Sequence, residues 1–193
     1  MERPPAPASH PTRFVYMARF IGQKGIPYLI EAFGLVAVKS GAVLELIGDG
    51  ELFDAMRERA SALGVADRVN FHGRMTLEAA KKLIAESDVY VVPSIGDCGG
   101  LAMLEAMAIG MPVIAANWAG PGEYADEHCG LLVDLPSREA FVTGLAAAMM
   151  MMIRTTKTIR VQARLATMTI PDRAPTRTMS RAPVALPPNP DRP

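Results

Sequence analysis

Apolar residues along the chain follow two kinds of pattern. Short runs rich in β-branched and aromatic residues predict buried strands, whereas longer runs in which apolar residues recur every three or four positions predict helices. The short runs place strands at residues 13–18, 43–47, 69–71, 88–93, 112–115 and 130–133. The longer runs place helices at residues 26–40, 51–63, 77–86, 121–127 and 137–150, with a further helix of about ten residues that stops at Gly110.

Strands that alternate with helices at this spacing predict an α/β fold. Such a chain forms a doubly wound parallel sheet, covered by helices on both faces and joined by right-handed crossovers. Ligands of these sheets bind beyond the carboxyl ends of the strands. We therefore expect the turns at residues 19–25, 48–50, 72–75, 94–100 and 117–122 to open on one edge.

The two ends of the chain differ in composition from its centre. Residues 1–12 contain four prolines and no periodic apolar pattern, which indicates an irregular lead-in or linker. Residues 153–193 are rich in Arg, Thr and Pro and lack a steady apolar period, so we expect them to be disordered. Residues 13–152 therefore form the single predicted domain.

Charge and cysteine content narrow the function classes. The net charge is zero, but residues 1–152 carry a balance of −6 and residues 153–193 a balance of +6, so the predicted domain offers no nucleic-acid surface. Two cysteines are too few for a disulfide scaffold. No apolar run reaches the roughly 18 residues of a membrane span, and no signal peptide is visible. We expect a cytoplasmic protein, with peripheral membrane contact left open.

The stretch from Ser94 to Gly110 carries the most specific pattern. It joins a predicted strand to a predicted helix through a turn that contains Gly99 and Gly100. The first N–H groups of a helix have no intrahelical acceptor, and the helix dipole is positive at that end. A bare backbone at this position therefore attracts an anion, most often phosphate.

Two carboxylates flank this turn. Asp97 precedes the glycines and Glu105 lies eight positions later, whereas the core-facing side of the helix is predicted to consist of Leu101, Leu104 and Ala108. Acids beside an anion site are suited to accept hydrogen bonds from hydroxyl groups, so a nucleotide sugar would satisfy both features. The alternative is that Glu105 is a solvated surface residue and Asp97 a turn residue or helix cap.

Two cations and one thiol are further candidates. Arg19 and Lys24 follow the first predicted strand, so they lie at the same edge and are suited to phosphate oxygens; solvated surface cations are the alternative. Cys98, near a helix start, is a weaker candidate for a nucleophilic thiol. Gly48 and Gly50 lack the third glycine of a dinucleotide fingerprint and predict a tight turn.

Taken in order, these features resemble the C-terminal, donor-binding half of retaining GT-B glycosyltransferases of family 4, the glycosyl transferases group 1 type. The resemblance covers residues 14–150 and implies a Rossmann-like domain. It rests on the Arg19 and Lys24 pair, residues 47–50, 69–73 and 92–94, the two acids eight positions apart, and residues 105–113 and 130–133.

The resemblance implies a role for each matched position. Arg19 and Lys24 would bind the diphosphate of a nucleotide sugar and neutralise it as it leaves. Asp97, where most members carry Glu, would hold a hydroxyl of the donor sugar, and Glu105 would hold the ribose hydroxyls. The other positions expected near the donor are Ser94, Gly99, Gly100 and Leu101, together with the loop of Gly73, Arg74 and Met75.

The implied activity is transfer of a hexose from a nucleotide diphosphate sugar to an unknown acceptor, with retention of configuration and without a metal or other cofactor. Full members of the family also carry an N-terminal domain that binds the acceptor. We therefore expect a separate domain or chain to supply that part. The alternative is a nucleotide-sugar-binding module or a truncated, inactive fragment without turnover of its own.

Overall fold

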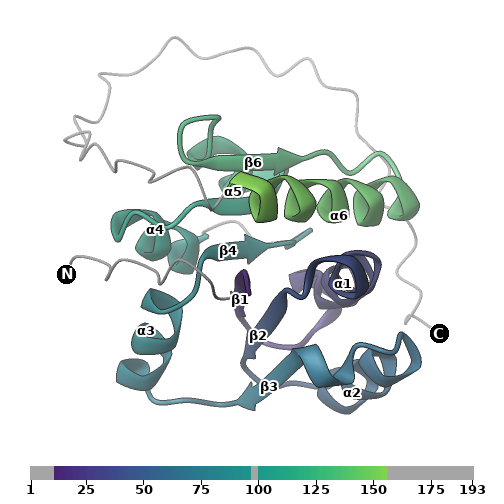
Figure 1. Cartoon of the computed structure of the whole chain (residues 1–193). Coiled ribbons are helices and arrows are strands. Elements are labelled where there is room, and N and C mark those ends of the chain that lie inside the picture. Colours follow the sequence, from purple (N-terminus) through teal and green to yellow (C-terminus); the bar gives the residue numbers. More distant parts are fainter. Residues whose placement is uncertain (1–10, 97–99, 156–193) are drawn as a thin grey trace, which may run out of the picture.

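The computed structural model describes residues 11–96 and 100–155, which form one parallel sheet with helices on both faces (Figure 1). The six strands run in the order β3-β2-β1-β4-β5-β6. Their bounds are β1 (Arg13–Met17), β2 (Val43–Ile47), β3 (Val69–Gly73), β4 (Val89–Val92), β5 (Val113–Ala116) and β6 (Gly130–Val133). All six predicted strands occur, and the predicted doubly wound α/β fold is confirmed.

The described helices also follow the predicted order. Their bounds are α1 (Ile26–Ser40), α2 (Phe53–Ala62), α3 (Leu77–Ala85), α4 (Leu101–Ala108), α5 (Ala119–Tyr124) and α6 (Arg138–Thr155), with 3-10 turns η1 (Gly22–Lys24) and η2 (Ala66–Arg68). Local signals account for several of these bounds. Gly41 caps the end of α1, and the hydroxyl of Thr76 accepts a hydrogen bond from the N–H of Ala79 at the start of α3.

The helices divide into two layers that bury separate cores. Helices α1, α2 and α6 pack on one face of the sheet, where Leu29, Phe33 and Phe141 are fully or almost fully buried. Helices α3 and α4 pack on the other face, against residues such as Val15 and Tyr90. Covering both faces in this way is the arrangement that parallel sheets require.

Helix α6 is longer than predicted. It continues to Thr155 rather than ending near Met150, and so includes the first three residues of the segment expected to be disordered. Met149 is fully buried, and Met152 and Ile153 pack partly against the same core, which explains the extension. The rest of that segment and residues 1–10 lie outside the described residues. None of the described helices, α6 included, is both long and apolar enough to cross a bilayer.

Helix α4 faces the core with a different side from the one predicted. Leu101 is 69 % exposed, and Ala108 is also exposed, whereas Met103 and Ala106 are 1 % exposed. The expected core face of Leu101, Leu104 and Ala108 is therefore wrong. Because nearly every residue of this helix is apolar, its sequence does not distinguish one face from another.

One charged residue is buried within the sheet. Glu45 on β2 is 4 % exposed, and its carboxylate lies 3.3 Å from Nε of Arg13 and 2.7 Å from Nε2 of His72. Arg13 is on β1 and His72 is on β3, the two strands that flank β2 in the sheet. The buried carboxylate is thus compensated by charge and by hydrogen bonding, as buried acids generally are.

Candidate functional site

The carboxyl edge of the sheet has a switch point between β1 and β4. The chain builds outward from β1 to β2 and β3, then returns to β4 and builds outward in the other direction. Doubly wound sheets bind their ligands at this point. A hollow of about 40 Å³ lies there, and its lining includes the ends of β1 and β4, Ser94, Gly100 and Leu101.

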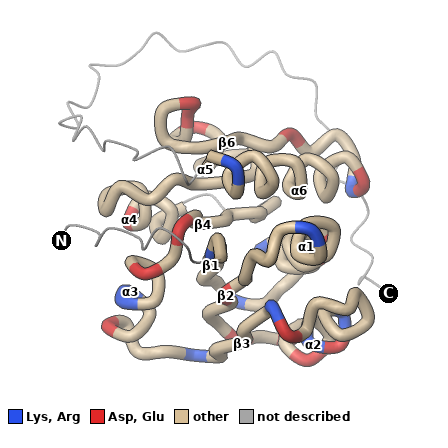
Figure 2. The backbone as a smooth tube through the Cα atoms, in the orientation of Figure 1, with Lys and Arg blue, Asp and Glu red and all other residues tan. Residues whose placement is uncertain are grey.

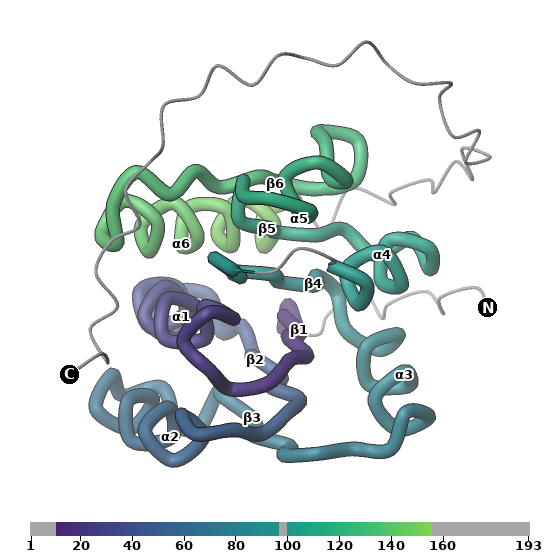
Figure 3. Tube along the Cα trace, turned by 180° about the vertical axis from the view of Figure 1, so that it is seen from behind, coloured from purple at the N-terminus to yellow at the C-terminus, as the bar shows by residue number. Residues whose placement is uncertain are grey.

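The loop from β1 to α1 carries Arg19 and Lys24 and is anchored at this switch point. Figure 3, the view from behind, shows the loop as the purple segment in front of the sheet. The N–H of Ile95, just after β4, donates to the carbonyl of Gln23 at 2.9 Å. This bond places Lys24 beside the segment that follows β4. The Arg19 side chain is exposed and makes no ion pair with the described residues.

Gly25 makes this close approach of the two segments possible. Its φ is 70°, a left-handed conformation that disfavours side chains, and a Cβ added there would lie 1.9 Å from the carbonyl oxygen of Pro93. Only a residue without a side chain fits between η1 and the end of β4. The fold therefore explains why a glycine follows Lys24 at position 25.

The tight turn at Gly48 and Gly50 is confirmed and holds the other end of the same loop. The N–H of Phe20 donates to the carbonyl of Asp49 at 2.9 Å, and a Cβ on Gly48 would meet the carbonyl oxygen of Ala18 at 1.9 Å. Phe53 stands where a dinucleotide fingerprint would have its third glycine. Its ring instead packs on Phe20, with 5.4 Å between the ring centroids.

Helix α4 begins at the hollow. Gly100 is its N-cap, and the first N–H groups after it have no acceptor within the helix, so they are available to an anion. Glu105 is exposed and lies four residues after Leu101, which places both on the same outward side of the helix. Asp97, Cys98 and Gly99 lie outside the described residues.

The loop of Gly73, Arg74 and Met75 lies farther along the same edge. The carbonyl of Gly73 accepts a hydrogen bond from the N–H of Gly48, and Nε of Arg74 lies 3.5 Å from a carboxylate oxygen of Asp49. Since β3 is two strands from β1, the loop is roughly 10 Å from the end of β1. Met75 packs partly into the core under α3.

The structure thus brings the described candidates to one edge. The loop between β1 and α1 (residues 18–25), called the cation loop below, surrounds the switch point together with Ser94 and the start of α4. Glu105 lies one turn along α4, and residues 73–75 lie toward the outer strand.

Sequence analysis missed Tyr16, whose hydroxyl contacts the cation loop from beneath. The only sequence signal for it is a hydroxyl-bearing aromatic residue three positions before Arg19. Among the described residues, no cluster of three or more His, Cys, Asp or Glu side chains is arranged to hold a metal ion.

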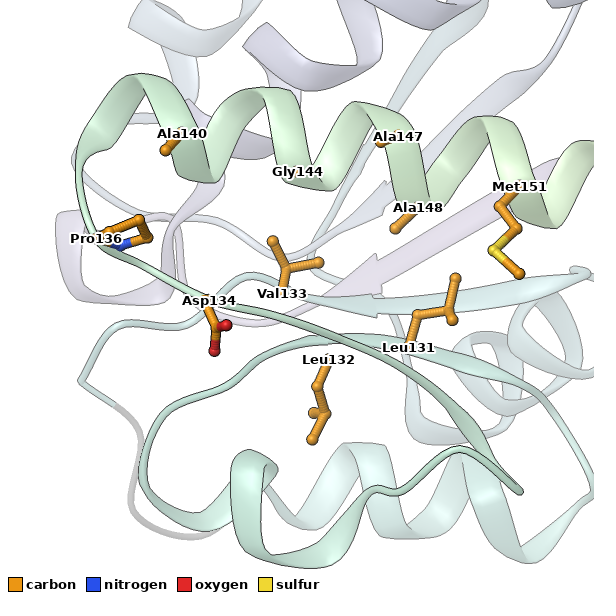
Figure 4. A pocket seen from close by; sticks show the side chains of 10 residues that line it. All are labelled: Leu131, Leu132, Val133, Asp134, Pro136, Ala140, Gly144, Ala147, Ala148 and Met151. Carbon is orange, nitrogen blue, oxygen red and sulfur yellow. The ribbon is translucent and has the colours of Figure 1, made fainter.

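A larger hollow lies elsewhere, between β6 and α6 (Figure 4). It has a volume of about 440 Å³ and is lined mainly by apolar side chains such as Leu131, Ala148 and Met151. Figure 2 shows that the charged residues of α6 are confined to its two ends. Among the described residues that line this hollow, Asp134 is the charged one and none is a cation. This hollow is therefore unsuited to a phosphate, and the smaller one at the switch point is the better candidate site.

The described cysteine, Cys129, is not an activated thiol. Burial raises its pKa above the usual value of 9.0, and hydrogen bonding to the nearby carboxylate of Asp126 acts in the same direction. The pKa of Asp126 is lowered, mainly by the hydrogen bond from the N–H of His128. At neutral pH this thiol is protonated and unreactive.

Cys129 is expected to react with iodoacetamide at pH 8 more slowly than free cysteine, because burial raises its pKa and its thiolate fraction is smaller. Its rate should rise with pH beyond the point where free cysteine levels off, and its ionisation should lower stability as pH rises through its raised pKa. Mass spectrometry of the peptide that contains Cys129 measures this rate separately from Cys98. A rate equal to that of N-acetylcysteine would contradict the assignment.

Comparisons with known proteins point to one group of enzymes. A model of the family described as "Glycosyl transferases group 1" matches residues 2–160. The lipopolysaccharide core biosynthesis glycosyltransferase LpsE of Rhizobium meliloti is 37% identical over 130 residues, which are 67% of this chain and 37% of LpsE. The GDP-mannose-dependent alpha-(1-6)-phosphatidylinositol monomannoside mannosyltransferase of Mycobacterium tuberculosis is 33% identical over 129 residues, 62% of this chain and 34% of that protein.

A solved structure shows the same fold. The pneumococcal O-GlcNAc transferase GtfA, crystallised with UDP and GlcNAc, aligns with a TM-score of 0.69 and 19% identity, covering 79% of this chain and 30% of that one. At this identity the likeness concerns the fold alone. The chain spans about a third of the length of the two curated relatives described above.

Proposed function

The chain belongs to the glycosyl transferases group 1 family, and we propose that it is the donor-binding, C-terminal half of a retaining GT-B enzyme of family 4. In this proposal it holds a nucleotide diphosphate sugar while a hexose is transferred to an acceptor with retention of configuration. The observation that carries the proposal is the meeting of a cation-bearing loop and a helix start at the switch point of the sheet.

The physical argument begins with the diphosphate. Its charge grows as the bond to the sugar breaks, so groups that stabilise negative charge at that place accelerate transfer. Arg19 and Lys24 supply two positive charges, and the N–H groups at the start of α4 supply oriented donors. Because protein groups already provide this stabilisation, the proposed reaction needs no metal ion.

The hydroxyl-bearing parts of the donor require acceptors. In the proposal, the exposed carboxylate of Glu105 accepts hydrogen bonds from the ribose hydroxyls, and Asp97 accepts one from the donor sugar. Ser94, Gly99 and residues 73–75 complete the surroundings of the nucleotide. Named relatives support a donor of this class, since one is called GDP-mannose-dependent and the pneumococcal structure contains UDP.

The proposal also assigns acceptor binding to another part of the enzyme. A separate domain or chain would bind the acceptor and close over the donor, which excludes water from the reaction. We place the protein in the cytoplasm, where nucleotide sugars are made, and leave the acceptor class open, including acceptors at a membrane surface. A donor-binding module without turnover is the second candidate, because the described candidate residues are all assigned to the donor and none to an acceptor.

Isothermal titration of the 193-residue chain with UDP and GDP tests the proposal. We expect at least one nucleoside diphosphate to bind, and the corresponding monophosphate to bind at least about tenfold more weakly, as expected when a charged contact is lost. Binding of neither diphosphate would overturn the donor-binding assignment. If alkylation of Cys98 then abolished an esterase activity, a thiol hydrolase would replace it.

Donor turnover separates an enzyme from a binding module. Incubation of the chain with a panel of UDP- and GDP-sugars, with detection of the released nucleoside diphosphate, reports slow transfer to water even when the acceptor is unknown. Release above the rate without protein, with the α-anomer of the free sugar formed first from an α-linked donor, supports a retaining enzyme. Tight binding without any release supports the module.

A further inference from the structure

Tyr16 lies directly beneath the cation loop. It is the fourth residue of β1 and is 1 % exposed, so its ring is held within the core. The ring meets that of Phe20 edge to face, with 6.0 Å between their centroids. Its hydroxyl therefore has a fixed position relative to the strand, and bulk water has little access to it.

The hydroxyl contacts the backbone of both cationic residues. Oη of Tyr16 lies 3.4 Å from the carbonyl oxygen of Arg19 and 3.4 Å from that of Lys24, so the hydroxyl is within donating distance of both acceptors. Each contact is long and individually weak. Together they have a geometric consequence, because two oxygens that both lie 3.4 Å from one atom are no more than about 6.8 Å apart.

The two ends of the loop are otherwise anchored to different parts of the sheet. Next to Arg19, the N–H of Phe20 donates to the carbonyl of Asp49 in the turn after β2. Next to Lys24, the carbonyl of Gln23 accepts from the N–H of Ile95 after β4. Within the loop, the N–H of Ile21 donates to the carbonyl of Arg19 and the N–H of Lys24 to the carbonyl of Ile21. The hydroxyl of Tyr16 adds a side-chain contact to both end carbonyls at once.

We propose that Tyr16 is a positioning residue that sets the separation of Arg19 and Lys24 and so prepares both charges for one diphosphate. The inference rests on the proposed function, since it concerns the same donor site. Preorganisation of this kind raises affinity because the ligand does not have to order the loop when it binds. Tyr16 also lines the hollow at the switch point, but the proposed role is exerted through the backbone of the loop that its hydroxyl contacts.

Tyr16→Phe removes the hydroxyl and keeps the ring. We expect it to weaken binding of UDP, or of GDP if that is the nucleotide bound, by about three- to tenfold, the effect of one lost hydrogen bond. The control is Tyr28→Phe. Tyr28 is 8 % exposed, and its ring packs edge to face against Phe141 of α6, with 5.6 Å between the centroids, outside the lining of the hollow at the switch point. This control also removes one tyrosine hydroxyl and should leave affinity unchanged.

A double-mutant cycle distinguishes positioning from a general loss of structure. In a Lys24→Ala background, Tyr16→Phe should weaken nucleotide binding by less than about twofold, because one of the charges it positions is gone. A full additional loss in that background, or no loss in the wild-type background, would overturn the inference alone. Failure of the wild-type chain to bind any nucleoside diphosphate would overturn the proposed function and this inference with it.

Discussion

Gly25→Ala is expected to lower the free energy of unfolding by about 3–5 kcal/mol, because it combines backbone strain with a steric clash. The φ of 70° disfavours any side chain, and the added Cβ would lie 1.9 Å from the carbonyl oxygen of Pro93. That atom belongs to the backbone at the end of β4 and cannot turn away as a flexible side chain would. Urea denaturation of the wild-type and variant chains measures the difference.

Gly64→Ala separates the two contributions. Gly64 has a φ of 69°, almost the same as Gly25, but a Cβ added there has no atom within 4 Å. This control therefore carries the backbone strain without the clash, and we expect a loss of about 1–2 kcal/mol. Equal losses in the two variants would show that the loop and the end of β4 are not held together as described.

Gly25→Ala should also impair the candidate donor site. Because Gly25 directly follows Lys24, moving the loop away from Pro93 displaces the lysine relative to the end of β4. Even under conditions where the variant is fully folded, its affinity for a nucleoside diphosphate should fall. The Gly64 variant, altered at the end of α2, should bind like the wild type.

The fold could be predicted because its signals are local and repeated. The pattern of α1 identified the bounds Ile26–Ser40, since a glycine at each end and the apolar spacing between them agree. Alternation of strands and helices then fixed the parallel sheet, and the rule that such sheets bind at their carboxyl ends placed the candidates at one edge. None of these steps required knowledge of a contact between distant residues.

Three of the features that sequence analysis missed depend on such distant contacts. The apolar residues of α4 gave no reason to choose Met103 over Leu101 for the core, and the neighbouring layer of the sheet decided it. Likewise, nothing near Glu45 in the sequence identifies Arg13 and His72 as its partners, because the three residues come from three different strands. The extra length of α6 follows from the core that receives Met149.

The glycines illustrate the same limit within the site. Gly25 and Gly48 were expected as turn residues, which is correct, but their closest neighbours are Pro93 and Ala18 on other segments. Their conformation is a local property, whereas the absence of space for a side chain is a property of the assembled edge. For this reason the sequence indicates where the chain turns but does not indicate that Gly25 contacts Pro93 or that Gly48 contacts Ala18.

Replacement of both Arg19 and Lys24 by Ala is expected to abolish measurable binding of nucleoside diphosphates. Each loss of a charge-assisted hydrogen bond should weaken binding by about 1.5–3 kcal/mol, roughly ten- to 150-fold, and two such losses exceed the range of a titration with a micromolar ligand. The single variants should each retain weakened but measurable binding. Titration calorimetry, with circular dichroism to confirm folding, measures the series.

Lys39→Ala provides the matched control for this series. Lys39 is exposed in the last turn of α1, and this helix runs from the cation loop back to the start of β2. The control therefore removes one positive charge from the opposite edge of the sheet and leaves the switch point unchanged. If all four variants bound nucleotide equally well, the charge at the cation loop would have no part in recognition. A loss confined to the Arg19 and Lys24 variants is the result that places the diphosphate at the switch point, because long-range attraction between net charges would affect the Lys39 variant as well.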